Sequence, residues 1–474
     1  MTRNNLLKFN RRYLTATLLA IISTGLQAQQ NQRPRLVISI VINQMTSESL
    51  ERYTTGAFEE GGFNRLIGNG KVFTTATMAF APVDAASAIT SIYTGTTPYY
   101  NGIANEQWLD RSTLKIISCV DDSKYKGVGT HAGGSASNVL SSMVGDELKV
   151  ATENRGKLYS IAYKREAAIL SACHYADCAF WIDGMTSRWC TSTYYLEGLP
   201  NWLPDLGTQE HTTNISERNY LVANAAISCI ANFSLGKDDD SDILALTFDV
   251  SDELETYKEL DKDISRIVKM ATNAVGEDKL LVITTGTGLF PPQDIDYARL
   301  RIPHGTYYIN RSAKLLELYL NALYGKGKYI EGCVNNQIYL NTEIAGQKKI
   351  DIDEMLSKSQ SFLLESSGVS NVYTRNQLMK ETSDMLAAIR SSFNSNTSGD
   401  LTIITQPGWK IINEETRQET RTHTASATFP IIIWGAGTKP GRLESHVTAE
   451  RISPTISKAI RIRAPNACVA TPLM

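Results

Sequence analysis

Three segments of the sequence end in residues that could carry out chemistry at one edge of a sheet. Residues 40–44 read Ile-Val-Ile-Asn-Gln, residues 246–249 read Leu-Thr-Phe-Asp, and residues 282–288 read Val-Ile-Thr-Thr-Gly-Thr-Gly. Two metal ions bound there would need carboxylates and imidazoles at all three ends. Asp249 is the one strong metal ligand among these ends. The sequence therefore predicts the frame of a metal site that has lost most of its ligands.

The residues around these ends predict the elements that position them. Residues 36–42 form a nearly continuous apolar, β-branched run, which is typical of a parallel strand covered by helices on both faces. Residues 253–275 carry an apolar stripe at helical spacing, and Gly276 follows as a helix stop. Residues 429–435 predict a further buried strand, and a final helix opens near residue 452. Strands that alternate with helices in this way indicate an α/β fold with a doubly wound sheet.

The polarity of the chain changes once, and this change predicts the domain organisation. Residues 291–418 are more polar than the segments on either side. We interpret them as a cap region inserted into the core. The core is then predicted to consist of residues 29–290 and residues 419–474.

The N-terminus has the pattern of a signal peptide, residues 1–28. Lys8, Arg11 and Arg12 precede an apolar run over residues 13–26, and a small residue, Ala28, follows at a plausible cleavage site. The run is shorter than the ~20 residues that a membrane-spanning helix needs. We therefore expect a mature protein that begins near Gln29, has no membrane span, and lies in the periplasm or outside the cell.

Composition excludes some partners and leaves others open. The formal net charge is −2 and 20% of the 474 residues are charged. Nothing in this balance indicates nucleic-acid binding or a polybasic patch that would bind a membrane surface. Seven cysteines are present. In an oxidising compartment some could pair, and Cys173 with Cys178 or Cys190 is the nearest candidate set. Cys229 and Cys468 fit better as buried small apolar residues.

Several stretches in a fixed order resemble one family. They are residues 60–66, 90–95, 157–174, 179–184, 191–195, 199–200, 255–264 and, most specifically, 429–473. Together they resemble the alkaline phosphatase superfamily, in particular secreted phosphate-monoesterases of Bacteroidetes related to nucleotide pyrophosphatase/phosphodiesterases. The resemblance implies a three-layer α/β/α sandwich with a mostly parallel sheet and an inserted cap region.

Active members of this family hold two zinc ions with three aspartates and three histidines, and attack phosphorus with a threonine or serine. Position by position, the resemblance places other residues here. The first-strand aspartate corresponds to Asn43 and the nucleophile to Ala85. The remaining ligand positions correspond to Asp249, Glu253, Gly286, Thr287 and Thr428.

The residues that grip phosphate in the family are changed as well. The family's asparagine falls near Glu106, and its lysine–arginine pair corresponds to Lys164 and Glu166. A carboxylate ~4 Å from a phosphate charge repels it by about 4 kcal/mol at an effective dielectric constant of ~20. We expect Lys164 to pair with one of the two glutamates and to close the old pocket.

Three residue patterns have a structural interpretation beside the chemical one. Asp249 fits a helix N-cap as well as a relict ligand, and Asp84 fits an N-cap better than a nucleophile shifted by one position. Residues 173–178 place Cys, His, Asp and Cys close together, as a zinc site would. The resemblance assigns this segment to a structural loop instead.

Two functions remain open on this reading. The first is an exported, catalytically inactive member of the family that acts by binding a protein partner or a small ligand in the cap cleft, with no cofactor. The second is a working metal-dependent phosphoric-ester hydrolase, for which zinc would be expected.

Overall fold

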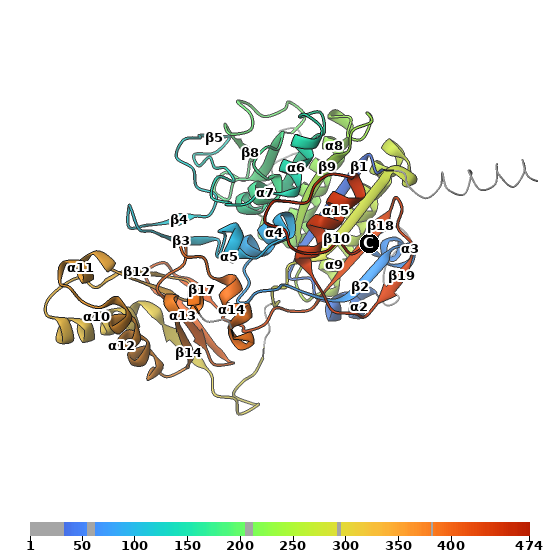
Figure 1. Ribbon diagram of the computed structural model, residues 1–474. Helices are drawn as coiled ribbons and strands as arrows, with labels where there is room; N and C mark the ends of the chain where they lie inside the picture. The colour runs from blue at the N-terminus through green and yellow to red at the C-terminus, as the bar shows by residue number, and fades with distance from the viewer. Residues whose placement is uncertain (1–32, 55–61, 204–211, 292–294, 381–382) are drawn as a thin grey trace, which may run out of the picture.

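The computed structural model describes residues 33–54, 62–203, 212–291, 295–380 and 383–474. The predicted signal peptide lies outside these residues. A large sheet with helices on both faces forms one part of the molecule, and a smaller lobe, yellow to orange in Figure 1, lies beside it. No helix within the described ranges is both long and apolar enough to cross a membrane.

The large sheet is mostly parallel at its centre. Strand β1 (Leu36–Asn43) lies between β9 (Asp242–Asp249) and β10 (Leu280–Gly286) and is parallel to both. The sheet has eleven strands, and the order of its main path is β19-β2-β18-β10-β1-β9-β6-β7-β8-β5. The bounds of the other strands are β2 (Lys71–Thr77), β5 (Gly127–Val128), β6 (Leu158–Ala162), β7 (Cys178–Ile182), β8 (Trp189–Ser192), β18 (Phe429–Gly435), β19 (Gly441–Leu443) and β20 (Val447–Thr448), which pairs with β2.

Two hydrophobic cores on opposite faces of β1 produce the three layers. Alternate side chains of a strand point to opposite faces, and every residue of β1 is buried. Val37 and Val41 join one core, whose helices are α4 (Ala85–Thr94), α6 (Val144–Ala151), α7 (Arg165–Ala172) and α15 (Ile452–Ile460). Leu36, Ile38, Ile40 and Ile42 join the other, whose helices are α2 (Ser47–Thr54), α3 (Phe63–Asn69), α8 (Ile215–Asn232) and α9 (Leu254–Val275). The predicted α/β/α architecture is confirmed.

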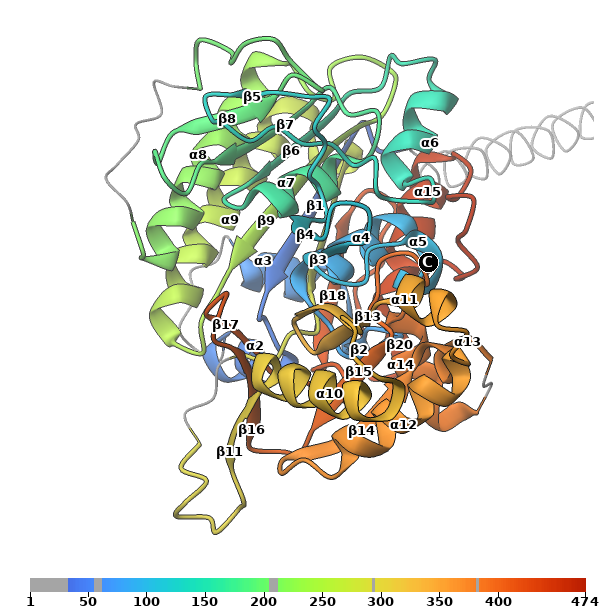
Figure 2. The same cartoon turned by 90° about the vertical axis from the view of Figure 1, so that its left-hand side faces the viewer.

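The smaller lobe has sheets and a hydrophobic core of its own. One sheet pairs β11 (Gly305–Tyr308), β16 (Trp409–Asn413) and β17 (Gln418–Thr420), in that order. The other has the order β12 (Ile330–Val334), β13 (Gln337–Leu340), β15 (Leu401–Thr405) and β14 (Val369–Thr374). Helices α10 (Ile309–Tyr324) and α12 (Ile352–Leu364) pack on these strands (Figure 2). Shorter helices are α11 (Thr342–Gln347), α13 (Arg375–Lys380) and α14 (Ala387–Ser392).

A hairpin of the core reaches the smaller lobe. It consists of β3 (Gln107–Asp110) and β4 (Lys115–Ser118), and Arg111 lies in its turn. The Arg111 guanidinium binds Asp400 at 2.7 Å and Glu331 at 3.1 Å. These ion pairs join the hairpin to the sheet that contains β12 and β15.

The predicted disulfide is wrong, because all seven cysteines are free thiols. Cys178 lies in the hydrophobic core on one face of the sheet, whereas Cys173 and Cys190 lie in the core on the other face. The sheet therefore separates Cys173 from Cys178, whereas Cys173 and Cys190 share one core and are both free thiols. Cys229 is buried, as expected, and Cys468 is partly exposed.

A candidate ligand site at the carboxyl edge of the sheet

Asn43 and Asp249 lie side by side at the ends of adjacent strands. They are register partners in the parallel pair of β1 and β9. The Asn43 amide donates from Nδ2 to Oδ1 of Asp249 at 2.9 Å. The amide oxygen of Asn43, Oδ1, is buried and has no hydrogen-bond partner within the described structure. The carboxylate that the sequence singles out is thus bound to an amide.

The next ligand positions lie at the same edge, where the space is closed. Gly286 ends β10 beside Ile42 of β1. A Cβ atom on Gly286 would lie 2.5 Å from the Met45 carbonyl oxygen and 2.7 Å from Cβ of Phe429. Thr287 is fully buried, and its hydroxyl has no partner among the described residues. Because Met45 and Phe429 fill the space around Gly286, an aspartate would not fit there without movement of the backbone.

Thr428 reaches this edge from the neighbouring strand. It precedes β18, which is antiparallel to β10, so the start of β18 lies next to the end of β10. The Thr428 carbonyl accepts a hydrogen bond from the amide of Ser47 at 3.0 Å. Its side chain is exposed. The structure thus gathers Asn43, Asp249, Gly286 and Thr428 at one edge of the sheet.

Asp249 does not cap the helix that follows it. The N-cap of α9 is Glu253, which is exposed and makes no side-chain cap hydrogen bond, so the N-cap interpretation of Asp249 is wrong. The backbone of Asp249 is instead held by Asn219 of α8, which donates to its carbonyl at 2.7 Å and accepts from its amide at 3.2 Å. Asn219 thus positions the backbone of Asp249, and sequence reasoning missed it; a buried asparagine on an otherwise apolar helix face is the signal that could have found it.

Ala85 begins helix α4, and Asp84 caps it. The Asp84 side chain accepts a hydrogen bond from the Ser87 amide at 2.8 Å, and the Asp84 amide donates to the Ser87 hydroxyl at 3.1 Å, which completes a capping box. Asp84 also accepts from the amide of Glu106 at 2.5 Å. Burial raises the pKa of Asp84 above its ordinary value. The N-cap interpretation is confirmed, and at Ala85 only a methyl group stands where the family has its nucleophile.

The three phosphate-grip positions form a predominantly acidic cluster. Burial, with the charges of Glu166 and Asp84, raises the pKa of Glu106 to about 7. Glu166 accepts a hydrogen bond from the Ser118 hydroxyl at 2.8 Å and forms an ion pair with Arg165 at 3.0 Å. Lys164 is exposed at the N-cap of α7, and its charge lowers the pKa of Glu106. We expected Lys164 to pair with one of the two glutamates. For Glu166 this expectation is wrong, because Glu166 pairs with Arg165.

The donor set at this edge does not fit two zinc ions. Each ion needs three or four nitrogen, oxygen or sulfur ligands. The ligand positions that the resemblance assigns offer two carboxylates, namely Asp249, already bonded to the amide of Asn43, and Glu253, exposed at the start of α9. The other positions offer a glycine and two threonines. Within the described part of the chain, no three His, Cys, Asp or Glu side chains lie together as a metal would require.

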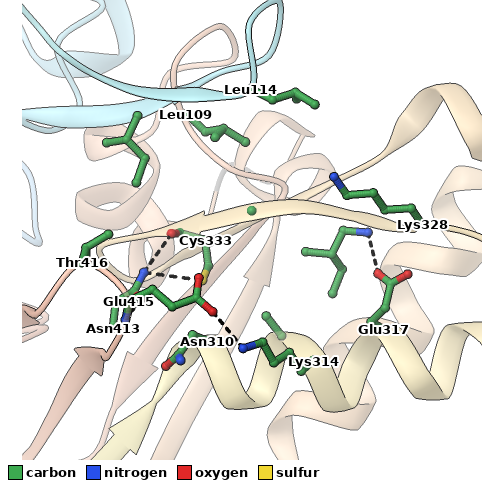
Figure 3. Close-up of a pocket in the computed structure, with 14 residues that line it drawn as sticks. Leu109, Leu114, Asn310, Lys314, Glu317, Lys328, Cys333, Asn413, Glu415 and Thr416 are labelled. Carbon is green, nitrogen blue, oxygen red and sulfur yellow. Dashed lines mark hydrogen bonds and ion pairs between the residues drawn. The ribbon is translucent and has the colours of Figure 1, made fainter.

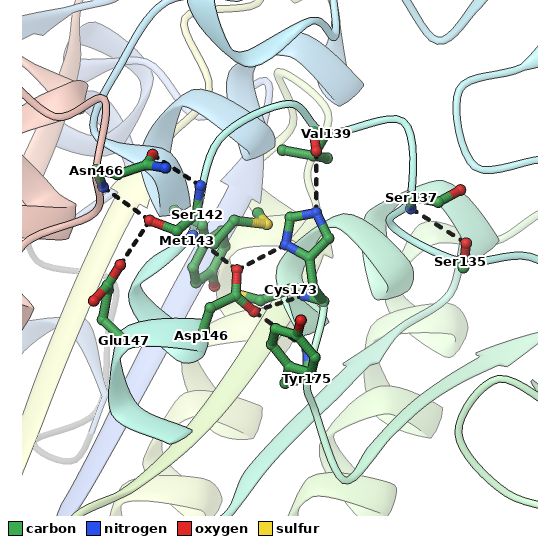
Figure 4. Close-up of polar contacts among 12 residues, drawn as sticks. Ser135, Ser137, Val139, Ser142, Met143, Asp146, Glu147, Cys173, Tyr175 and Asn466 are labelled. Carbon is green, nitrogen blue, oxygen red and sulfur yellow. Dashed lines mark hydrogen bonds and ion pairs between the residues drawn. The ribbon is translucent and has the colours of Figure 1, made fainter. Parts of the chain in front are cut away.

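The other candidate metal segment, residues 173–178, is engaged in structural contacts. His174 binds Asp146 through Nδ1 at 2.7 Å and the Val139 carbonyl through Nε2 at 3.0 Å. Asp177 pairs with Lys149 at 2.6 Å, and the Cys178 thiol lies 3.2 Å from the Thr191 hydroxyl. Figure 4 shows the Asp146 carboxylate among its hydrogen-bond partners. The loop interpretation of the segment fits these contacts.

Two hollows lie near the smaller lobe. The larger is a cleft of about 880 Å³ that Pro82, Val83 and Gly288 join to the site, and aromatic and charged residues of the smaller lobe line the rest. The smaller, about 400 Å³, lies between the β3–β4 hairpin and α10 (Figure 3). Most of its charged groups have partners, since Lys314 pairs with Glu415 at 2.8 Å and Glu317 accepts from the Ile330 amide, while Lys328 is a further cation on its wall. The larger cleft is the better candidate for a ligand.

Comparison with known proteins shows the family to which this chain belongs. The chain belongs to the type I phosphodiesterase / nucleotide pyrophosphatase family, whose model matches residues 37–428.

Similar proteins span the whole chain. A protein named alkaline phosphatase PafA, from Elizabethkingia meningoseptica, is 24% identical, and the match covers 96% of this chain and 97% of the relative. Alkaline phosphatase PhoV from Synechococcus elongatus is 25% identical, with 92% of each chain covered. The crystal structure of PafA superposes with a TM-score of 0.81 at 23% identity, covering 93% of this chain and 98% of that one. The fold is therefore that of an alkaline phosphatase.

Proposed function

We propose that this chain is an exported, non-hydrolytic member of the family that binds a ligand in the cleft beside the old catalytic edge. The observation that carries the proposal is the hydrogen bond from Asn43 to Asp249. It places a neutral amide where a second metal-binding carboxylate would be needed. The export part rests on the basic start and apolar run within residues 1–28.

The chemistry of phosphate-ester hydrolysis supports a non-hydrolytic role. The slowest of these reactions need up to ~10²¹-fold acceleration. Metal ions that stabilise the developing charge and a positioned nucleophile supply much of it. Ala85 offers no hydroxyl, and the cluster of Glu106 and Glu166 would repel a phosphate group rather than hold it.

The family itself favours a second candidate, a working metal-dependent phosphoric-ester hydrolase. Relatives that match most of the chain are named alkaline phosphatases. In this case the metal ions would be held by ligands other than the positions considered above. The two candidates make different predictions for the metal content of the protein.

Elemental analysis of the purified mature protein is expected to find no stoichiometric zinc. The reason is the donor set, in which Asp249 is the one carboxylate left among the strand-end ligands. An Asp249→Ala variant, prepared in the same way, serves as the control and is expected to hold the same trace amount. About two zinc ions per wild-type chain would overturn the proposal, whether the Asp249→Ala variant loses them or keeps them.

A further inference from the structure

The cleft of about 880 Å³ combines two features that seldom coincide by packing alone, namely exposed aromatic faces and an unequal number of charges. Pockets that bind small organic molecules have volumes of about 300–1,000 Å³ and place a few polar groups among aromatic walls. The assignment of a ligand to this cleft rests on the proposed function in one respect, that the cleft holds a ligand.

Charge in the cleft favours a ligand with a single negative charge. Among the described lining residues, Lys410, Glu419 and Arg421 carry full charges. Glu419 pairs with Lys410 at 2.8 Å and with Nε of Arg421 at 3.3 Å. The ion pairs with these two cations lower the pKa of Glu419, so it stays ionised near neutral pH. The described lining of the cleft therefore carries two positive charges and one negative charge, a net charge of one positive unit.

The geometry of Arg421 leaves its binding edge available. Within the described structure, the guanidinium of Arg421 donates one hydrogen bond, from Nε to Glu419. The two terminal amino groups can therefore meet an oxyanion with two parallel hydrogen bonds, the arrangement that arginine makes with carboxylates and similar anions. Glu419, which lies two residues before Arg421 and pairs with it, would repel a second negative charge on the same ligand.

An aromatic platform lies next to this arginine. The rings of Phe290 and His423 lie in tilted contact, with centroids 4.2 Å apart and an interplanar angle of 34°. Phe290 keeps 37% of its surface exposed. Burial, and then the charge of Arg421, lowers the pKa of His423, so its ring is neutral and offers an aromatic face. Because His423 follows Arg421 by two residues, their Cα atoms are at most ~7 Å apart.

We propose that this cleft binds a small organic monoanion that carries an aromatic ring, with the ring against Phe290 and His423 and the anionic group at Arg421. A second aromatic pair, Tyr297 and His304 with centroids 6.0 Å apart, extends the same wall. The anionic group lies at Arg421 and not at the old phosphate position, where Glu106 and Glu166 would repel it.

Titration calorimetry with 1-naphthalenesulfonate tests the proposal. One molecule is expected to bind per chain. Cyclohexanesulfonate, which lacks the ring, and 2-naphthalenemethanol, which lacks the charge, are expected to bind at least about 10-fold more weakly. Inorganic phosphate at the same concentration is expected not to displace the probe.

Variants assign the binding to this cleft. Arg421→Gln is expected to weaken binding by about 10-fold or more, and Phe290→Leu by about 3- to 10-fold. Arg442→Gln is the matched control: its side chain is exposed on β19, outside the cleft, and paired with Glu51. It is expected to change nothing. Thermal unfolding of each variant shows whether the fold is kept.

Equal affinity for all three probes, or binding that Arg421→Gln and Phe290→Leu leave unchanged, would overturn the proposal. This failure is distinct from failure of the proposed function. A protein that binds the arylsulfonate at Arg421 and yet contains zinc and cleaves phosphate esters would refute the non-hydrolytic role alone. A protein with neither zinc nor arylsulfonate binding would refute the ligand class alone.

Discussion

Asp400→Ala is expected to lower the free energy of unfolding by about 3–5 kcal/mol, because it breaks a buried ionic network. The Asp400 side chain is 1% exposed and pairs with Arg111 at 2.7 Å and Arg375 at 3.0 Å. It also accepts a hydrogen bond from the Leu340 amide at 2.7 Å. Its loss leaves Arg375 without its carboxylate partner and leaves Arg111 with Glu331 alone, and it weakens the link between the β3–β4 hairpin and the smaller lobe.

Urea unfolding of the wild type and the variant measures this effect. Glu354→Gln is the control, since Glu354 forms an exposed ion pair with Lys358 in the same lobe. Exposed pairs of this kind contribute about 0.3–0.5 kcal/mol. If Asp400→Ala costs no more than Glu354→Gln, the network does not hold the two parts of the molecule together.

His174→Ala is expected to cost about 2–3 kcal/mol at pH 6, and less as the pH rises. Both ring nitrogens of His174 face oxygen acceptors, Oδ2 of Asp146 at 2.7 Å and the Val139 carbonyl at 3.0 Å. A ring that donates from both nitrogens is an imidazolium. Burial lowers the pKa of His174, but the hydrogen bond and charge of Asp146 raise it by more, so the pKa lies above its ordinary value of 6.5.

The pH dependence follows from the direction of this shift. A histidine whose pKa is raised on folding contributes its proton-linked stability in full below the unfolded pKa, about 6.5, and loses it as the pH rises through the folded pKa. The difference between wild type and His174→Ala should therefore shrink between pH 6 and pH 9. His446→Ala, at an exposed position, is expected to change stability by no more than about 0.5 kcal/mol. A constant difference at all pH values would mean that His174 is neutral in the folded protein.

Local sequence pattern was sufficient to predict the elements that carry the site. The apolar run of residues 36–42 is buried along its whole length in β1, because a strand covered on both faces leaves no polar side to break the pattern. The capping of α4 by Asp84 was predictable for a similar reason, since an N-cap involves only residues within one turn.

Contacts between distant segments could not be predicted in this way. Asp249 could be read as a cap or a ligand, and the choice depended on Asn43 of the neighbouring strand and Asn219 of helix α8. Both are distant from Asp249 in sequence and lie against it in the fold. The partner of Glu166 depended on the residue at which α7 begins. The helix begins at Arg165, with Lys164 as its N-cap, and Arg165 is the residue that pairs with Glu166. Asp400 was not singled out at all, because its importance comes from burial and from two arginines in other elements.

Restoring a single residue is not expected to create an enzyme. Catalytic groups that act as a unit do not contribute one by one. A threonine introduced at Ala85 would supply a hydroxyl, but no metal ion would lower its pKa or stabilise the developing charge. The wild-type protein and Ala85→Thr are therefore expected to behave alike in an assay of phosphate-ester hydrolysis.

Turnover of p-nitrophenyl phosphate by the purified mature protein, with and without added zinc, tests the non-hydrolytic role most directly. The account predicts no hydrolysis above the rate of the buffer in either condition, for the wild type and for Ala85→Thr. Hydrolysis by the wild type that a chelator or Asp249→Ala abolishes would contradict it, and would show that the edge formed by β1, β9 and β10 is a working metal-dependent active site.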